Sequence, residues 1–202
     1  MGDFKNMILF IYTLVLFILH GYGFLYIFHA EYTSEFKYPE IMWFLLFITS
    51  LQYLDIPFSF FLTKSNPVAV FVQVSGRLLV LWVASHMVSW KYAAFSLVAV
   101  YLLSELCRGP YYLSNCLGTP NRSLTWLRYN AFKVLYPVGF TCEALVFINV
   151  FFVSGKIPID IKDRYFQYSL LFTVFFLTIV TFLYRSMSRK AAQKNKTLAK
   201  ME

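Results

Sequence analysis

Long apolar runs separated by short polar turns dominate the sequence. Each run is too long for a β-strand, and a helix needs roughly 20 apolar residues to cross a bilayer. A segment in lipid must satisfy its backbone polar groups internally, so we predict that these runs are helices. They cover residues 7–28, 41–62, 67–88, 92–106, 129–153 and 166–184. The expected fold class is therefore all-α, a polytopic membrane bundle of six transmembrane helices.

The composition agrees with a membrane protein. Of the 202 residues, 59% are hydrophobic and only 14% are charged, which is too little polar surface for a soluble domain. The aromatic content of 21% suits lipid contact and interfacial belts. We predict a single transmembrane domain over residues 1–202, with a basic cytosolic tail at 185–202. The first run is too long for a signal-peptide core and lacks a cleavage site, so we expect it to remain as a span.

Positive charge is biased toward one side of the predicted membrane. The net charge is +8, and a cluster follows the last run, formed by Arg185, Arg189, Lys190, Lys194, Lys196 and Lys200. A basic segment directly after a span indicates orientation and contact with anionic lipid, not nucleic acid. With Arg108, Arg122 and Arg128 counted on the same side, the bias favours an even number of spans and two cytosolic termini. The glycosylation triplets at Asn121 and Asn195 are then expected to stay unmodified.

The three cysteines are predicted to be free thiols. Cys107, Cys116 and Cys142 lie in or near apolar runs and have no paired spacing. Cys116 also begins a Cys-x5-Arg pattern that ends at Arg122, as in phosphatases that wrap backbone amides around a phosphate. Pro120 removes one of those amides and no predicted strand leads into the loop. A phosphatase is therefore disfavoured.

Four ionisable residues interrupt the apolar runs: Asp55, Arg77, Glu105 and Glu143. Each costs ~2.5–3.5 kcal/mol at mid-span on insertion scales, so such groups usually face the bundle interior. One interpretation is structural, with internal pairs such as Arg77 with Asp55 or Glu105 holding helices in register. Four such groups on four predicted helices favour a polar cavity. Lys133 lies nearer a helix end and can reach the interface.

Tyr136 and Glu143 are a candidate acid–base pair. They are seven residues apart, about two helical turns, so both side chains point the same way roughly 10 Å apart. Pro137 lies between them, frees a carbonyl about one turn earlier and can kink the helix. A phenol and a carboxyl on one intramembrane face suit proton transfer. Hydrogen bonding between helices is the alternative use of the same residues.

Several short motifs around this pair keep a common order from about residue 50 to residue 153. They are Leu-Asp-Ile at 54–56, Gln-Val-Ser-Gly-Arg at 73–77 followed by Trp82, Ser-Glu-Leu-Cys-Arg at 104–108, Trp-Leu-Arg-Tyr at 126–129 and Leu-Tyr-Pro-Val-Gly at 135–139. Together with Glu143 they make the chain resemble the very-long-chain (3R)-3-hydroxyacyl-CoA dehydratase family, also called the protein-tyrosine-phosphatase-like A family.

The resemblance implies a multi-pass membrane enzyme of the endoplasmic reticulum, a lyase of fatty-acid elongation. It would dehydrate a long-chain (3R)-3-hydroxyacyl-CoA to the trans-2-enoyl-CoA, the third step of the elongation cycle. The catalytic Tyr and Glu of the family correspond to Tyr136 and Glu143. Substrate-binding or supporting roles fall to Arg77, Glu105, Arg108, Arg128 and Asp55. The resemblance implies no metal or redox cofactor, and coenzyme A enters as part of the substrate. The implied partners are this substrate, membrane lipid and other elongation enzymes.

Two features depart from the family pattern. Gly109-Pro110 stand where the family usually has Tyr, and we expect the helix to end early there, although an extension past Arg108 to Leu113 stays open. The loop at 155–164 is also shorter than the family's. The alternative function is therefore a non-catalytic membrane scaffold for elongation enzymes or lipids. A transporter is disfavoured because no inverted pair of broken helices is evident.

Overall fold

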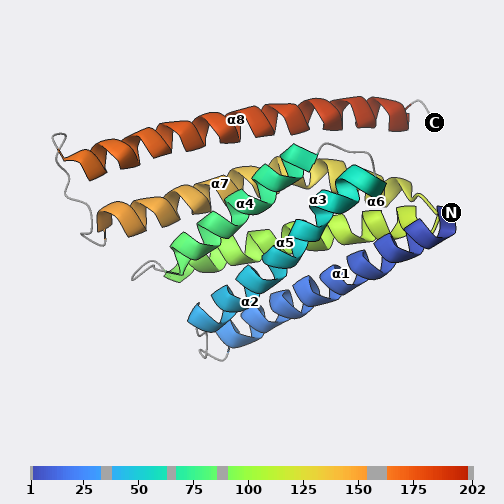
Figure 1. The fold of residues 1–202 in the computed structure, drawn as a ribbon, viewed down its shortest axis with the longest axis horizontal. Coiled ribbons are helices and arrows are strands. Elements are labelled where there is room, and N and C mark those ends of the chain that lie inside the picture. The colour runs from blue at the N-terminus through green and yellow to red at the C-terminus, as the bar shows by residue number, and fades with distance from the viewer. Residues whose placement is uncertain (1, 33–37, 63–66, 86–90, 154–162, 200–202) are drawn as a thin grey trace. The chain divides into compact units, whose positions relative to one another are not determined.

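The computed structural model of the chain describes residues 2–32, 38–62, 67–85, 91–153 and 163–199. These residues form helices and connecting turns, with no β-strand among them, which confirms the all-α class (Figure 1). The helices of at least nine residues are α1 (Gly2–Tyr32), α2 (Tyr38–Leu51), α4 (Pro67–Ala84), α5 (Lys91–Cys116), α6 (Arg122–Asn130), α7 (Phe132–Ile148) and α8 (Arg164–Ala199). The predicted loop at 155–164 falls almost entirely outside the described residues.

Five helical segments of the described chain are long and apolar enough to cross a membrane. They are Phe4–Ala30, Ile41–Phe61, Tyr92–Cys116, Arg122–Phe151 and Arg164–Gln193. A further apolar segment, Val70–Ala84 of α4, is shorter. The number of long segments fits a multi-pass membrane protein, whereas the count of six spans stays a prediction.

The helices gather into two compact units. Unit 1 contains Met1–His86 and Tyr101–Asn121, and unit 2 contains Met87–Val100 and Arg122–Glu202. Helix α5 therefore contributes its first ten residues to unit 2 and the remainder to unit 1.

In unit 1, α2 packs against both α1 and α4 (Figure 1). Gly23 of α1 permits close packing, because a Cβ there would lie 3.0 Å from Phe44 of α2 and 3.2 Å from Leu102 of α5. The buried side chains around this contact are aliphatic, among them Ile27, Met42 and Leu102. The unit therefore has its own apolar core.

The second span is an irregular helix. After α2 the chain continues as a 3-10 turn, η1 (Gln52–Leu54), a short α3 (Asp55–Pro57) and a π-helical turn, η2 (Phe58–Leu62). Pro57 has no N–H to donate, so the regular hydrogen-bond ladder cannot continue through it. The irregular stretch begins directly before Asp55, the ionisable residue of this span.

Helix α5 runs through Gly109 and Pro110 to Cys116, so the expectation of an early end there was wrong. Gly109 is buried, and a Cβ on it would lie 2.5 Å from Cδ2 of Phe17 on α1. Glycine and proline both disfavour a helix, and α5 continues through them at the point where α1 packs against Gly109. Two residues after Cys116, Gly118 adopts a left-handed φ of 69° and its N–H donates to the carbonyl of Asn115 at 3.1 Å, which closes the helix.

In unit 2, α6 and α7 form an almost continuous helix. They meet at Ala131, whose N–H donates to the carbonyl of Leu127 at 2.9 Å and whose carbonyl accepts from Leu135 at 3.0 Å. A π-helical turn, η3 (Asn149–Val153), extends α7. The α7–α8 contact is aromatic: the Phe147 ring lies 5.1 Å from Phe172 and 5.4 Å from Phe176.

Helix α8 is 36 residues long and extends well past its apolar part. Asp163 caps its start, since Oδ1 accepts from the backbone N–H of Tyr165 at 2.8 Å and of Phe166 at 3.1 Å. The basic tail predicted from residue 185 continues this helix as far as Ala199.

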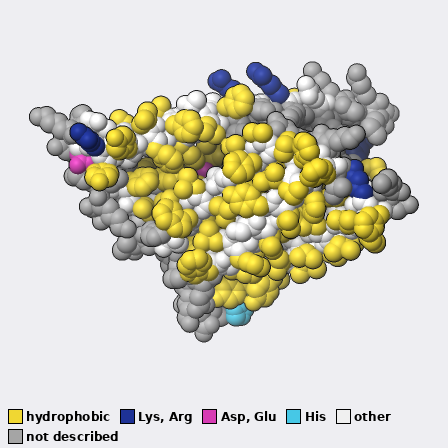
Figure 2. All heavy atoms as spheres, viewed as in Figure 1, with side chains coloured by type: hydrophobic (Ala, Val, Ile, Leu, Met, Phe, Trp, Pro, Cys, Tyr) yellow, Lys and Arg dark blue, Asp and Glu magenta, His cyan; other side chains and the backbone are white. Residues whose placement is uncertain are grey.

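Large apolar side chains are exposed along the described helices. Examples are Trp43 on α2, Phe61 on η2 and Phe182 on α8, each 71% or 72% exposed. In the face drawn in Figure 2, apolar side chains cover most of the described surface and charged groups are few. Such a surface is unfavourable in water and suits the hydrocarbon of a bilayer.

Candidate functional site

Unit 1 brings together four charged side chains, three of which interrupt predicted spans. The Arg77 guanidinium on α4 donates to Glu105 on α5 at 2.5 Å. Arg108, one turn after Glu105, donates to Asp55 at 3.3 Å and to Glu105 at 3.5 Å. The predicted pairing of Arg77 with Glu105 is confirmed, while Asp55 pairs with Arg108. Arg108, which was counted with the cytosolic charges, lies within α5 because this helix continues to Cys116.

Neutral groups hold the two guanidinium groups in place. Arg77 donates to Oε1 of the buried Gln52 at 3.4 Å and lies over the Tyr101 ring at 5.6 Å. Arg108 lies over the Tyr112 ring at 5.1 Å. With two carboxylates and two guanidinium groups, this ion cluster (Asp55, Arg77, Glu105 and Arg108) has no net formal charge. Its members are 11–24% exposed, so each would be costly without its partners.

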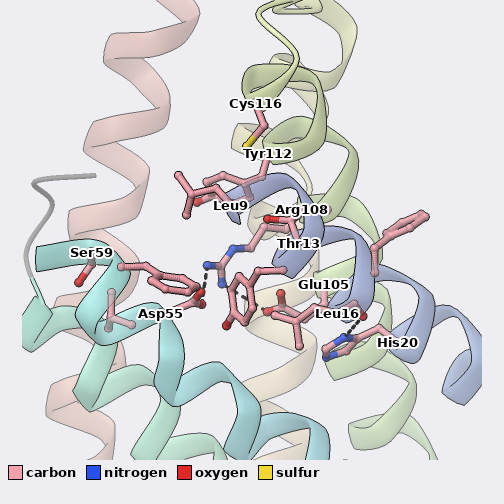
Figure 3. Close-up of a pocket in the computed structure, with 15 residues that line it drawn as sticks. Leu9, Thr13, Leu16, His20, Asp55, Ser59, Glu105, Arg108, Tyr112 and Cys116 are labelled. Carbon is pink, nitrogen blue, oxygen red and sulfur yellow. Dashed lines mark hydrogen bonds and ion pairs between the residues drawn. The ribbon is translucent and has the colours of Figure 1, made fainter. Parts of the chain in front are cut away.

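A cavity of about 280 Å³ lies beside the ion cluster. Figure 3 shows Arg108 directed from α5 toward Asp55, with α1 passing along the other side. The lining is apolar toward Leu9, Leu16 and Phe58 and polar where the cluster faces it. The arrangement matches the polar cavity that the interrupted runs predicted, but Glu143 belongs to unit 2 and is not one of its lining residues.

Helix α1 adds three polar residues to this cavity, Tyr12, Thr13 and His20, none of which was singled out from the sequence. The Tyr12 hydroxyl donates to the carbonyl of Leu51 at 3.3 Å, and His20 is only 5% exposed. His20 interrupts the apolar run at 7–28, which is the same signal that identified Asp55. It was missed because only formally charged residues were considered.

The candidate acid–base pair lies on α7 in unit 2. Tyr136 is half-buried, with its ring at 5.9 Å from Phe132 and 5.3 Å from Phe140. Glu143 is buried at 8% exposure. The helix is unbroken between them, so the predicted two-turn spacing applies.

The backbone between the two residues is adapted to Pro137 and to close packing. Thr141 Oγ1 donates to the carbonyl of Pro137 at 2.8 Å. Gly139 is buried, and a Cβ there would lie 3.4 Å from Cγ1 of Val100 on the unit 2 part of α5. A small residue at 139 thus lets α5 approach α7 midway between Tyr136 and Glu143.

The basic residues near this pair lie toward α6. Arg128 is half-buried on α6 and lies over the Tyr129 ring at 5.8 Å. Lys133 is exposed and donates to Oδ1 of Asn130 at 2.8 Å. Of the predicted site residues, the structure therefore joins the four of the ion cluster in unit 1 and places Arg128, Tyr136 and Glu143 in unit 2.

The cysteine pattern has no strand before it. Cys116 is the last residue of helix α5, and the turn at Gly118 closes that helix. Cys107, Cys116 and Cys142 are free thiols, as predicted. Over the described ranges, no group of three or more His, Cys, Asp or Glu residues could hold a metal ion.

Comparison with known proteins identifies the family to which this chain belongs. A family model described as "Protein tyrosine phosphatase-like protein, PTPLA" matches residues 49–200. A very-long-chain (3R)-3-hydroxyacyl-CoA dehydratase of Gallus gallus is 30% identical over 143 residues, 64% of this chain and 40% of that protein. A probable enzyme of the same name from Schizosaccharomyces pombe is 32% identical over 94 residues, 45% of each chain. One from Danio rerio is 28% identical over 156 residues, 72% of this chain and 43% of its own.

The chain thus spans less than half the length of these curated relatives. No solved structure matches it. The family match begins after α1, so Tyr12 and His20 lie outside it.

Proposed function

Because this chain belongs to the protein tyrosine phosphatase-like (PTPLA) family, we propose that it is a 3-hydroxyacyl-CoA dehydratase, a hydro-lyase of fatty-acid elongation. It removes water from a long-chain (3R)-3-hydroxyacyl-CoA and gives the trans-2-enoyl-CoA. The names of the relatives from Gallus gallus, Schizosaccharomyces pombe and Danio rerio support this activity. The proposal includes six spans in the endoplasmic reticulum membrane, with both termini cytosolic.

The observation that carries the proposal is a phenol and a buried carboxyl on one unbroken helix, at Tyr136 and Glu143. Elimination needs a base that takes the proton alpha to the thioester and an acid that protonates the departing hydroxyl, which leaves as water. A Tyr/Glu pair supplies one of each in either assignment. The reaction balances without an external oxidant or reductant, so no redox cofactor is required.

The supporting residues have distinct parts in this proposal. The ion cluster of Asp55, Arg77, Glu105 and Arg108 fixes the helices of unit 1 around a polar cavity. Arg128 on α6 contributes to binding of the coenzyme A phosphates in this proposal, because guanidinium groups bind phosphate in a bidentate manner. Other elongation enzymes and membrane lipid are the proposed partners.

The test is a dehydration assay on purified Tyr136→Phe and Glu143→Gln proteins. Loss of either general acid–base group should lower turnover by on the order of 10²–10⁴. Both substitutions keep the side-chain shape, so helix content and thermal stability should remain close to wild type. Tyr184→Phe is the matched control, since the Tyr184 ring lies 6.1 Å from Phe132 and has no proposed chemical role.

Normal turnover in both variants would remove the pair from the mechanism. Loss of turnover together with loss of folding would assign the two residues to helix–helix hydrogen bonding. A folded wild type that fails to turn over any acyl chain length would favour the non-catalytic scaffold.

A further inference from the structure

His20 lines the unit 1 cavity, and only one of its two ring nitrogens has a hydrogen bond among the described residues. Its Nδ1 lies 2.7 Å from the carbonyl oxygen of Leu16. A carbonyl oxygen only accepts, so Nδ1 must carry the proton and donate it. In the neutral ring, Nε2 is then a lone-pair acceptor. Among the described residues, Nε2 has no hydrogen-bond partner, although the side chain is 95% buried and lines the cavity (Figure 3).

The charge balance of the cavity favours the neutral ring. The ion cluster already pairs two guanidinium groups with two carboxylates through contacts of 2.5–3.5 Å. A protonated His20 would add a third buried cation with no third carboxylate to balance it, which is costly. For the same reason an ionic ligand gains no net charge attraction here. The free Nε2 therefore selects a neutral hydrogen-bond donor.

The walls of the cavity define the rest of the ligand. Leu9, Leu16 and Phe58 supply apolar parts of the wall, and polar side chains lie between them, with Asp55 and Arg108 near the middle and His20 at one end (Figure 3). The volume of about 280 Å³ is near the lower end of the range for small-ligand sites. An apolar chain that carries one neutral donor fits the apolar parts of this wall and the acceptor at His20.

The position of His20 depends on a packing contact between α1 and α5. Phe17 lies one turn before His20 and packs directly on Gly109, where any Cβ would come within 2.5 Å of its ring. Gly109 also lines the cavity. The glycine therefore lets α1 approach α5 closely beside the cavity that His20 lines.

We propose that this cavity binds the hydroxyl end of a neutral long-chain lipid, with Nε2 of His20 accepting the hydrogen bond from the hydroxyl. The ligand differs from the substrate of the proposed dehydration, because coenzyme A carries phosphates and this cavity has no excess positive charge. The inference does not depend on that activity, and its test requires no turnover.

The experiment uses the full chain in lipid nanodiscs with ¹⁵N-labelled histidine rings. The sequence holds three histidines, so the ring signals are few, and a His20→Phe variant assigns the one of interest. Addition of 1-hexadecanol should shift the Nε2 signal of His20, whereas hexadecane, which lacks the donor, should not. The His29 signal is the internal control, since His29 is exposed on the same helix.

Photolabelling measures the binding itself. A diazirine-bearing 1-hexadecanol should label peptides of α1 and α5, and unlabelled 1-hexadecanol should compete. His20→Phe should weaken that competition on the order of tenfold, the value of one buried hydrogen bond. His20→Gln, which keeps an acceptor oxygen, should restore part of it, and His29→Phe should have no effect.

Three results would overturn the proposal. The first is an equal response of the His20 signal to the alcohol and the alkane. The second is unchanged competition in a His20→Phe protein that retains wild-type helix content. The third is displacement of the probe by a 3-hydroxyacyl-CoA but not by free alcohol, which would assign the cavity to the substrate.

Discussion

At the scale of single residues, Glu105 connects the two halves of the ion cluster. It accepts from Arg77 and from Arg108, and its side chain is only 11% exposed. Glu105→Gln removes one negative charge and leaves two guanidinium groups to share Asp55. The expected loss of unfolding free energy is ~3–5 kcal/mol, as for other broken buried pairs. Denaturant titration in detergent measures it.

The control is the charge-balanced double substitution Glu105→Gln with Arg77→Gln. It removes one charge of each sign and leaves the Arg108–Asp55 pair in place. Its stability should recover part of the loss, because a neutral pair costs less than an unpaired cation. A single Glu105→Gln protein as stable as wild type would mean that the cluster does not hold unit 1 together.

Gly109 allows a sharper steric prediction. Gly109→Ala places a methyl group 2.5 Å from Cδ2 of Phe17, so α1 must shift or the ring must rotate. Overpacking of this kind costs ~1–3 kcal/mol. Gly76→Ala is the matched control, since a Cβ at Gly76 meets nothing within 4 Å and alanine favours a helix. Equal thermal stability of the two variants would contradict the close packing of α1 on α5.

At the scale of the elements, aromatic packing holds α7 to α8. Phe147 is 6% exposed and contacts the rings of both Phe172 and Phe176. Phe147→Ala should lower the unfolding free energy by ~3–5 kcal/mol. Phe175→Ala, on the exposed face of α8 at 61% exposure, should change it little in lipid. Unfolding of the two variants side by side in nanodiscs gives the comparison.

The apolar runs predicted the helices but not their irregular parts. Runs longer than a strand leave few alternatives in lipid, so α1, α2, α5, α7 and α8 followed from length and hydropathy. The continuation of α5 through Pro110 could not be predicted from the apolar run. It occurs where Gly109 contacts Phe17, a residue distant in sequence. The π-helical turns η2 and η3 likewise have no local apolar pattern that distinguishes them.

The site was predictable where a single helix defines it. The spacing of Tyr136 and Glu143 survives in the structure because α7 is continuous between them. The ion pairs were only partly predictable, since Arg108 lies beyond the predicted apolar run and its pairing with Asp55 joins residues 53 positions apart. His20 required knowledge that α1 packs beside α5, which composition and spacing do not supply.

At the scale of the whole molecule, the number of spans decides on which side each terminus lies. Six spans place both termini on one side, whereas the five long segments alone would place them on opposite sides. In a protein with Cys107, Cys116 and Cys142 replaced by alanine, Lys5→Cys or Arg189→Cys supplies a single cysteine. Its accessibility shows on which side of the membrane that terminus lies. In sealed microsomes, an impermeant maleimide should modify both positions, since both are proposed to be cytosolic.

Modification of only one of the two positions would refute the even number of spans. The native triplet at Asn121 gives an independent check, because a glycan there would place the turn between α5 and α6 on the luminal side. Detergent-solubilised protein, in which both cysteines are accessible, controls for their reactivity.

The length of α8 determines how far the carboxyl end stands from the bilayer. Its 36 residues extend about 54 Å, against about 30 Å of hydrocarbon, and a usual tilt of about 20° shortens the excess only slightly. The carboxyl-terminal part of this helix therefore extends beyond the hydrocarbon into water. At physiological salt, where the Debye length is about 8 Å, charges near Arg185 still sense the lipid phosphates, while those close to Ala199 are screened from them.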